Sequence, residues 1–559
     1  MDGMTRRRLL QYGIGAGAAL ALPWAARPAS AAKGGSLRKY VQRVPLPGDG
    51  IVVASGSGST YEFTQTEISR QLHPDLPPTP FWAYDDGSGL GGQAGSFGML
   101  LAARRDERVE ATFLNDLPAT YPGWIPVDTR LTPDGSVVRP MTHLHGGFVA
   151  GKDDGNPAVT PLGFARGETQ SVVYPNEQAA TLLWFHDHAL GATRLTVFAG
   201  LAAGYLLRDE FDTGDEDNVN GLPSGPYELP LVIQDRQFDH DTGEFLYPRS
   251  DIPGVTWIGE YFGDVMLVNG RVWPYLEVEP RLYRLRLLNG CNGRILRLHL
   301  GGARIWQIGA DGGLFDAPVP LRELMLAPAQ RADLLVDFSR LAGRTAVLKN
   351  LPPRPPVVTP AAPLVEVMEI RVASGTPVDP VIPDELVGGS LPALEPTEEK
   401  RFVTLNETGV DTPEWKLTLN GGAFMGEEGD DIGVEEDEVE EWYYVNLTGD
   451  THPMHHHLFM SQLIGRVPFD AARYAADAPS ADFGVTGIDP EPYYTAPLQP
   501  PEPWERGWRD TVMAHPGQVT IIRARFELPS TASGPQTYVH HCHIVEHEDN
   551  DMMRTFTVG

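Results

Sequence analysis

Apolar residues along this chain come in short runs that alternate with polar positions, and turn-forming residues interrupt them about every ten residues. Such runs are typical of β-strands, because successive strand side chains point to opposite faces of a sheet. Clear examples lie at 171–174, 282–288, 332–338 and 519–526. No long stretch repeats its apolar residues at helical spacing, and no fixed period indicates a solenoid or propeller. The pattern therefore predicts an all-β protein.

Composition agrees with this prediction and indicates several domains. The 559 residues include 60 glycines and 50 prolines without a collagen repeat, which suits many short strands joined by tight turns. The length allows roughly three or four domains. Two segments resemble linkers, because 211–224 is polar and rich in turn formers and 374–400 is rich in proline. We therefore predict domains at 32–215, 216–378 and 401–559, with 379–400 as the second linker.

The N-terminal residues have the features of an export signal. Three arginines at 6–8 precede an apolar stretch that ends near Trp24, and a small-residue cleavage site follows at 29–31. A membrane anchor is the alternative, but the apolar stretch is shorter than the roughly 20 residues that a spanning helix needs. We predict that residues 1–31 form a signal peptide for the twin-arginine export machinery, and that the protein is periplasmic or extracellular.

The net charge limits which partners the protein can bind, and the cysteine content limits its disulfides. The formal net charge of -30 argues against a nucleic-acid partner, because so acidic a surface repels phosphates. The acidic run 435–441 could attract a cationic substrate, although a solvated loop is the simpler interpretation. With only two cysteines, Cys291 and Cys542, the fold has at most one disulfide and depends on buried apolar surface. Cys291 is most simply a small buried residue.

Eleven of the 16 histidines fall in four short segments with a repeated spacing. Histidines at i and i+2 on a strand project from the same face, so each such pair can reach one metal cluster. A single pair is more often a turn or a satisfied surface site, but four pairs in one chain indicate metal binding. Imidazole is a good copper ligand, and eight imidazoles facing one cavity could hold three copper ions. The pairs are His143 and His145, His186 and His188, His455 and His457, and His541 and His543.

Cys542 indicates a second kind of metal site. It lies between His541 and His543, so on a strand its thiolate faces away from the cavity that these histidines serve. One thiolate, two imidazoles and a weak axial methionine form the ligand set of a blue-copper electron-transfer site. The covalent connection from Cys542 to both flanking histidines would then join the two sites and carry electrons between them.

The other ligands of this site are expected nearby in the sequence. His547 and Met552 follow Cys542 at five-residue steps and can close one loop around a metal. We expect His452 to supply the second imidazole. It precedes His455 by an odd number of residues and is followed by Pro453, so its side chain does not share the face of His455 and His457.

Zinc is the rival metal. A structural zinc site is closed by four ligands and a catalytic one uses about three, which leaves most of the spaced histidines unexplained. The remaining histidines have no place in the pattern, and we expect them at ordinary surface or hydrogen-bonded positions. They are His73, His240, His299, His456, His515 and His540.

Seven longer stretches carry a family resemblance. They read HLHGG (143–147), WFHDHALGATRLTVFAGLAAGY (184–205), LVNGRVWPYLEVEP (267–280), QIGADGG (307–313), LAPAQRADLLVDF (326–338), THPMHHH (451–457) and YVHHCHIVEHEDNDMMR (538–554). With them the chain resembles the three-domain multicopper oxidases, and within that family the bacterial spore-coat laccases, bilirubin oxidases and phenoxazinone synthases. The resemblance implies three cupredoxin-like Greek-key β-sandwich domains, with a three-copper cluster between the first and third.

The resemblance also implies four copper ions and a role for each candidate ligand. It assigns one type 1 copper to His452, Cys542, His547 and the axial Met552. It assigns one type 2 copper to His143 and His455. It assigns a type 3 pair to His145, His186, His188, His457, His541 and His543.

Two acidic residues complete the implied site. Reduction of dioxygen consumes protons, so an acidic group near the cluster is expected to relay them. Asp154 and Glu548 occupy the positions where the family places such acids. The alternatives are a turn residue for Asp154, which precedes Gly155, and a solvated carboxylate for Glu548.

The implied activity is one-electron oxidation of phenols, aromatic amines or bilirubin-like pigments, coupled to reduction of dioxygen to water, by a protein that we expect to be a monomer. One alternative reductant is Mn(II) or Fe(II), which needs carboxylates near the type 1 copper and could use 435–441. A copper-free structural protein on the same fold is an alternative of a different class, and the complete ligand set argues against it. The chain departs from some spore-coat laccases in that Cys291 has no disulfide partner once Cys542 binds copper.

Overall fold

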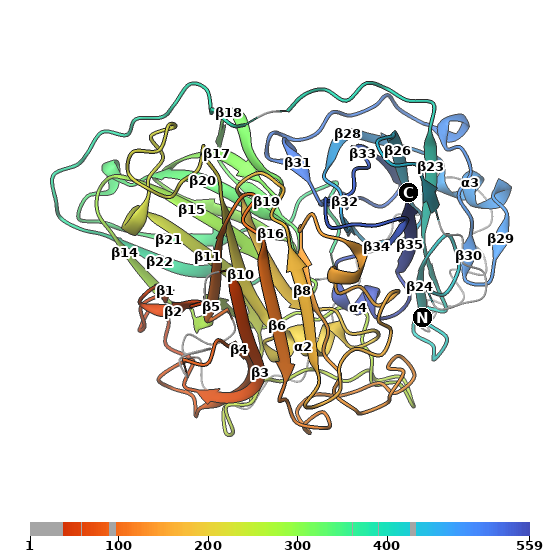
Figure 1. The fold of residues 1–559 in the computed structure, drawn as a ribbon, viewed down its shortest axis with the longest axis horizontal. Coiled ribbons are helices and arrows are strands. Elements are labelled where there is room, and N and C mark those ends of the chain that lie inside the picture. Colours follow the sequence, from red (N-terminus) through yellow and green to blue (C-terminus); the bar gives the residue numbers. More distant parts are fainter. Residues whose placement is uncertain (1–36, 57–58, 89–96, 360, 390, 425–431) are drawn as a thin grey trace, which may run out of the picture.

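The computed structural model describes residues 37–559 apart from 57–58, 89–96, 360, 390 and 425–431, so the proposed signal peptide at 1–31 lies outside the described residues. The described part is built mainly from strands, which form three pairs of sheets in sequence order (Figure 1). The strands of these pairs come from residues 46–208, 228–372 and 400–558. The all-β prediction is therefore confirmed.

The first sheet pair consists of a six-stranded and a four-stranded sheet. The larger has the order β1 (Leu46–Pro47), β2 (Gly50–Val53), β5 (Met99–Arg104), β10 (Ala202–Arg208), β9 (Leu182–Asp187) and β7 (Thr142–His145). The smaller has the order β4 (Thr79–Asp85), β3 (Thr60–Arg70), β6 (Val109–Asn115) and β8 (Thr169–Tyr174).

The second sheet pair has seven and five strands. The larger sheet has the order β13 (Arg271–Val272), β12 (Val265–Val268), β11 (Glu228–Arg236), β15 (Leu282–Asn289), β20 (Arg331–Asp337), β17 (Arg304–Ala310) and β18 (Gly313–Leu321). The smaller has the order β14 (Tyr275–Val278), β22 (Glu366–Val372), β21 (Thr345–Asn350), β16 (Leu296–Leu300) and β19 (Leu324–Leu326).

The third sheet pair has six and five strands. One sheet has the order β24 (Lys416–Leu419), β23 (Lys400–Thr408), β26 (Val439–Asn446), β33 (Gln518–Arg525), β28 (Ser461–Pro468) and β31 (Trp508–Arg509). The other has the order β25 (Ile432–Val434), β35 (Met553–Val558), β34 (Gln536–Cys542), β27 (His452–His456) and β32 (Thr511–Ala514). A short hairpin of β29 (Ser480–Ala481) and β30 (Gly484–Val485) lies outside both.

Among the described residues, helices are few and short. The α-helices are α2 (Thr193–Ala199), α3 (Ala471–Asp477) and α4 (Val545–Glu548), and the 3-10 turns are η1 (Gly151–Asp153), η2 (Gly225–Tyr227), η3 (Ser339–Leu341), η4 (Glu491–Tyr493) and η5 (Pro503–Glu505). None of the helices in the described residues has the length and apolar content needed to cross a membrane.

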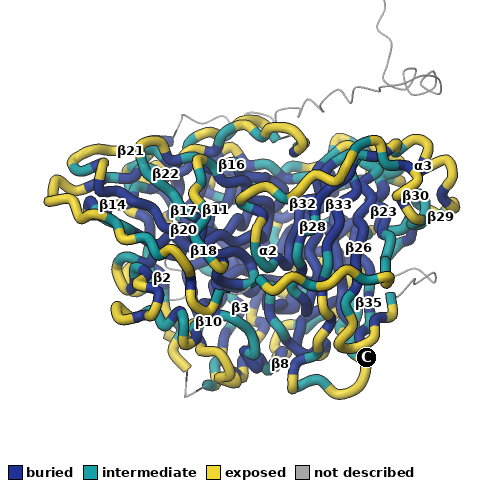
Figure 2. Tube along the Cα trace, turned by 90° about the horizontal axis from the view of Figure 1, so that it is seen from above, coloured by how far each residue is buried: buried dark blue, intermediate teal, exposed yellow. Residues whose placement is uncertain are grey.

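Alternation of side chains explains how the strands build the cores. In β6, Val109, Ala111 and Phe113 are buried, whereas Glu110 and Leu114 at alternate positions are exposed. Such a strand covers the core with one face only. All residues of β9 and β11 are instead buried, because other parts of the protein pack against both faces of these strands. Figure 2 shows this distribution, with buried segments through the interior of the molecule and exposed segments at its surface.

The two predicted linkers differ in character. The segment 374–400 contains no strand before β23 among its described residues, and it runs along the surface from the second sheet pair to the third (Figure 1). The segment 211–224 also lacks strands, but several of its residues are buried. Asp212 among them accepts hydrogen bonds from Arg284 at 2.7 and 2.8 Å, so this segment is fixed to the second sheet pair rather than solvated.

Candidate metal centres

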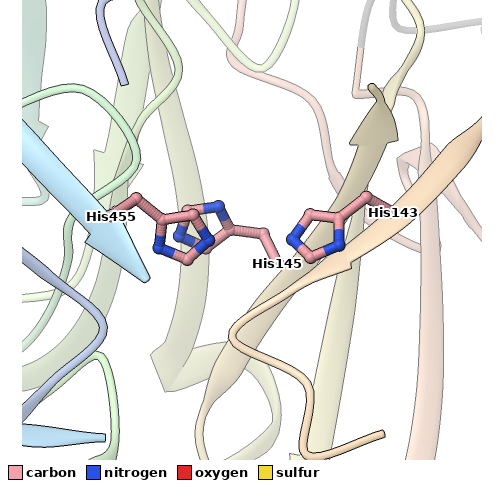
Figure 3. A group of neighbouring side chains, drawn as sticks. All are labelled: His143, His145 and His455. Atoms are coloured by element: carbon pink, nitrogen blue, oxygen red, sulfur yellow. The ribbon is translucent and has the colours of Figure 1, made fainter. Parts of the chain in front are cut away.

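Two strand pairs present the histidine segments to each other. In the first sheet pair, β7 lies antiparallel to β9, with His143 opposite His186. In the third, β27 lies antiparallel to β34, with His455 opposite His541. Histidines from β7 and β27 point toward one another, as Figure 3 shows for His143, His145 and His455. The cluster is therefore assembled from two sheet pairs that are far apart in the sequence.

The structure brings all eight paired histidines into one buried cluster. Each exposes 2% or less of its surface. They form three groups of three whose ligand atoms lie within 4.8 Å of one another, and two of these groups share His145. The groups are His143 with His145 and His455, His145 with His186 and His543, and His188 with His457 and His541.

Ring stacking joins the two sides of the cluster. The rings of His143 and His457 stack with centroids 3.9 Å apart. Those of His145 and His455 stack at 3.8 Å with an interplanar angle of 14°. Each stack combines one ring from the first sheet pair with one from the third, so the cluster exists only when both pairs are docked.

Outer hydrogen bonds determine which nitrogen of a ring faces the cluster. In His143, His186 and His455, Nδ1 donates to a main-chain carbonyl, at 2.7, 2.8 and 2.8 Å. A carbonyl only accepts, so Nε2 of each ring keeps its lone pair. All three Nε2 atoms are buried without a hydrogen-bond partner. Metal-binding histidines have this arrangement, because the outer hydrogen bond fixes the tautomer.

Distances between inner nitrogens test whether a metal fits. Nε2 of His541 lies 3.2 Å from Nε2 of His188 and 3.4 Å from Nε2 of His457. Two nitrogens about 2 Å from one ion at a tetrahedral angle lie about 3.3 Å apart. Burial lowers the pKa of His188 and His541 well below the usual range, so the rings are neutral, which is the form that binds metals. The donor set therefore fits a metal cluster.

A second group contains the thiol. Sγ of Cys542 lies 3.5 Å from Nδ1 of His452 and 3.6 Å from Nδ1 of His547, and these two nitrogens are 3.2 Å apart. All three residues are buried. Burial raises the pKa of the Cys542 thiol well above its usual range, so a thiolate here needs a cation beside it. The hydroxyl of Thr448 lies 2.6 Å from Nε2 of His452 and leaves Nδ1 for the metal.

The main chain of Met552 is hydrogen-bonded to the main chains of Cys542 and His547, at 3.0 Å each, so Met552 lies beside this group. It is fully buried and belongs to the same apolar cluster as Cys542. Met454, the strand partner of Cys542 on β27, belongs to that cluster too. Sulfur and apolar side chains thus surround the thiol on the face opposite the eight histidines.

Asp154 and Glu548 both contact candidate ligands. Asp154 Oδ2 accepts a hydrogen bond from Nδ1 of His457 at 2.6 Å. The Glu548 carboxylate lies 3.4 Å from Nδ1 of His188 and 3.3 Å from Nδ1 of His541. Both acids are buried, so the alternative of a solvated carboxylate for Glu548 is wrong.

Most of the histidines outside the pattern are buried. His73, His456 and His515 are buried but hydrogen-bonded, which is one of the two expected situations. The expectation is wrong for His540, which is buried and has no hydrogen-bond partner for either ring nitrogen among the described residues. His456 points away from the cluster, stacks on Phe459 at 4.2 Å and lies 3.1 Å from the Arg509 carbonyl. His240 and His299 are partly exposed.

The acidic run divides into two parts. Residues 435–438 are exposed, in agreement with a solvated loop. Glu440 and Glu441 are instead buried in β26, where they pair with Arg401 and Arg523 at 2.6 and 2.5 Å. The last two carboxylates are therefore neutralised inside the fold and cannot hold a substrate cation.

Sequence reasoning missed two carboxylates beside the candidate ligands. Oδ1 of Asp510 lies 3.2 Å from Nε2 of His145. Oε1 of Glu260 lies 3.8 Å from Nε2 of His547. Neither residue is near a histidine pair in the sequence, so no local signal identifies them. Cys291, as expected, is a buried free thiol.

Known proteins share this architecture along nearly the whole chain. A family model described as multicopper oxidase matches residues 395–559. The chain is 37% identical to a laccase of Bacillus stratosphericus and 34% identical to a laccase of Bacillus subtilis strain 168, and each alignment covers 94% of this chain and 99% of the relative. The solved structure of the McoA multicopper oxidase from the hyperthermophile Aquifex aeolicus matches with a TM-score of 0.71 and 26% identity, covering 94% of this chain and 100% of that chain.

Cupredoxin-like sandwiches that hold a thiol site next to a cluster of eight imidazoles define a copper oxidoreductase that uses dioxygen as its acceptor. The identity along the whole chain makes the assignment more specific. The chain belongs to the multicopper oxidase family.

Proposed function

We propose that the protein is a laccase-like oxidase. It takes single electrons from phenols, aromatic amines or bilirubin-like pigments, and four of these electrons with four protons reduce one dioxygen to two waters. The observation that carries this proposal is the placement of Cys542 on β34 directly between two ligands of the histidine cluster. The laccase relatives support the choice of substrate class.

Four copper ions account for the candidate ligands. His452, Cys542, His547 and Met552 would hold the type 1 ion, and His143 with His455 the type 2 ion. The groups around His186 and His188 would each hold one ion of the type 3 pair. When bound, copper supplies the one-electron redox chemistry that the side chains lack.

The chain supplies the connection between the two sites. Cys542 is bonded through the main chain to His541 and His543, whose side chains lie on the opposite face of the strand. Both sites are buried, so the path between them excludes water. Electrons taken from a reductant near His452 and His547 therefore have a short through-bond path to the histidine cluster.

Protons reach the cluster through acids that touch its outer nitrogens. Asp154 Oδ2 accepts from His457, and the Glu548 carboxylate lies between His188 and His541. We assign both residues to proton supply, because dioxygen reduction consumes protons inside a site that solvent does not reach. Both acids also orient the imidazoles that they contact.

A metal ion is the weaker candidate for the reductant. Glu440 and Glu441 are buried in ion pairs, so only 435–438 of the acidic run stays available to a cation. Export in the folded state through the twin-arginine machinery, with the copper already bound, and a monomeric active form complete the proposal.

One set of assays tests the proposal. A single batch of copper-loaded protein is compared on a phenol, bilirubin, Mn(II), Fe(II) and Cu(I), with oxygen uptake as the common readout. We expect the phenol and bilirubin to be oxidised with the highest kcat/KM. A higher value for a metal ion would replace the substrate class, and failure to bind copper would revive the structural alternative.

A further inference from the structure

Asp510 lies where the three sheet pairs meet. It follows β31, precedes β32 and is 1% exposed. Its Oδ1 lies 3.2 Å from Nε2 of His145. The guanidinium of Arg331 donates to both of its carboxylate oxygens, at 2.8 and 2.5 Å. The carboxylate therefore connects a candidate metal ligand from the first sheet pair to an arginine from the second.

The contact with Asp510 determines which ring nitrogen of His145 carries the proton. A carboxylate accepts hydrogen bonds, so the proton of His145 is on Nε2 and the lone pair is on Nδ1. Nδ1 of His145 is buried without a hydrogen-bond partner. His143 and His455 have the opposite arrangement, with Nδ1 bound to a carbonyl and Nε2 free. His145 thus presents a different nitrogen to the cluster, and the Asp510 side chain is the acceptor that makes this possible.

Arg331 is itself held firmly. It begins β20, and its remaining donors bind the carbonyls of Leu182, Ala329 and Asp311 at 3.0, 3.1 and 3.1 Å. Leu182 is the first residue of β9 in the first sheet pair, four residues before His186. The guanidinium therefore fixes Asp510 relative to both of the other sheet pairs.

The glycine after His145 shows how closely these groups pack. Gly146 has a φ of +79°, and a Cβ there would lie 2.6 Å from both Arg331 Nη2 and Asp510 Oδ2. No side chain fits at this position without displacing the ion pair. The glycine is thus explained by the contact between Arg331 and Asp510 as well as by its backbone conformation.

We propose that Asp510 is a positioning residue that sets the tautomer and orientation of His145, and that Arg331 holds Asp510 in place for this role. The second sheet pair contributes none of the candidate ligands, yet through Arg331 it controls how one part of the cluster is assembled. This inference rests on the proposed role of His145 as a copper ligand.

The test compares Asp510→Ala with a matched control, Asp311→Asn. Asp311 is also buried and lies 3.7 Å from Arg331, but none of its hydrogen bonds in the described residues reaches a candidate ligand. Copper per chain, the electron paramagnetic resonance spectrum and the blue absorption are measured on the same samples. The blue absorption reports folding and the Cys542 site independently of His145.

We expect Asp510→Ala to keep the blue absorption and to lose one copper per chain. The remaining copper ion of the type 3 pair should become visible by electron paramagnetic resonance, because the second copper ion no longer cancels its spin. Asp510→Asn keeps an acceptor oxygen, so it should retain more copper than Asp510→Ala. Asp311→Asn should match the wild type.

Full copper with an unchanged spectrum in Asp510→Ala would overturn the proposal, and so would equal copper loss in Asp311→Asn. If Asp510→Ala does not fold, the double variant Arg331→Met with Asp510→Ala removes the unpaired buried charge. That variant should fold and show the same selective loss, and full copper in it would also overturn the proposal. A wild-type protein without copper would instead refute the proposed function.

Discussion

The main-chain N–H of Cys542 donates a hydrogen bond to the carbonyl of Met552, 3.0 Å away, and both side chains lie in one apolar cluster. The next residue, Met553, is the strand partner of His541 across β34 and β35. Side chains of directly paired strand residues share a face of the sheet. Met553 therefore faces the histidine cluster, whereas Met552 faces the thiol.

This relationship predicts which methionine tunes the type 1 copper. A weak axial sulfur donates electron density to the metal, so its loss raises the reduction potential. Leucine has a similar volume and no sulfur, so the exchange creates little cavity. Met552→Leu should keep the blue absorption and raise the potential, while Met553→Leu leaves it near wild type. Redox titration of both variants checks this, and a rise confined to Met553→Leu would reassign the axial ligand.

Cys542→Ser should abolish both the blue colour and turnover. Serine cannot replace the thiolate as a ligand, and it also interrupts the path to His541 and His543. The eight-histidine cluster has its own ligands, so the variant should retain the copper bound there. Absorption spectra and copper analysis of the purified variant test this, and a colourless wild type with full activity would contradict the assignment.

His456 should be dispensable for copper binding. Its ring stacks on Phe459, on the face of β27 opposite to the cluster. His456→Gln should keep a full complement of copper, whereas His455→Gln and His457→Gln should lose type 2 or type 3 copper. Copper per chain is the measurement. Equal copper loss in all three variants would show that His456 is needed for copper binding as much as His455 and His457 are.

Asp154→Asn and Glu548→Gln should slow dioxygen reduction by at least about 10-fold without changing the type 1 spectrum. Each substitution removes an acid that touches a ligand's outer nitrogen but leaves the ligands themselves. Asp153→Asn is the matched control, because Asp153 is also buried but accepts its hydrogen bond from the main chain of Val173. Oxygen uptake and absorption spectra are the readouts, and wild-type rates in both variants would remove these acids from proton supply.

A buried ion network away from the metals predicts how stability depends on pH. Burial alone would raise the pKa of Glu228, but nearby Arg286 and Arg284 lower it from 4.5 to about 2. The same arginines hold the pKa of Asp212 below its usual range, again against the effect of burial. These carboxylates therefore stabilise the folded protein above their unfolded pKa. The contribution is lost as the pH falls from about 4.5 through about 2.

Asp212→Asn should reduce the free energy of unfolding at neutral pH by about 3–5 kcal/mol, because it removes one of the carboxylates that neutralise the buried Arg284 and Arg286. Its stability should also fall less steeply in acid than that of the wild type. The control Asp116→Asn, which breaks an exposed pair with Arg166, should cost under about 1 kcal/mol. Denaturant unfolding at several pH values measures both, and parallel curves for wild type and Asp212→Asn would contradict the linkage.

The local sequence pattern was sufficient to predict those features that depend on the alternation of side chains along one strand. Side chains two residues apart share a face, so the spacing of His143 and His145, and the position of Cys542 between two histidines, determined which groups can reach a common metal. The short apolar runs determined the strands, because burial of one face requires the same period.

Only the tertiary structure decided which groups meet across the sheet pairs. The contacts of Asp510 with His145 and Arg331 join residues that are 365 and 179 positions apart, and no local period encodes such a distance. Burial of His456 and His540, and the ion pairs that neutralise Glu440 and Glu441, likewise depend on what packs against each strand. Strand periodicity decides which way a side chain points, whereas the docking of distant strands decides what it touches.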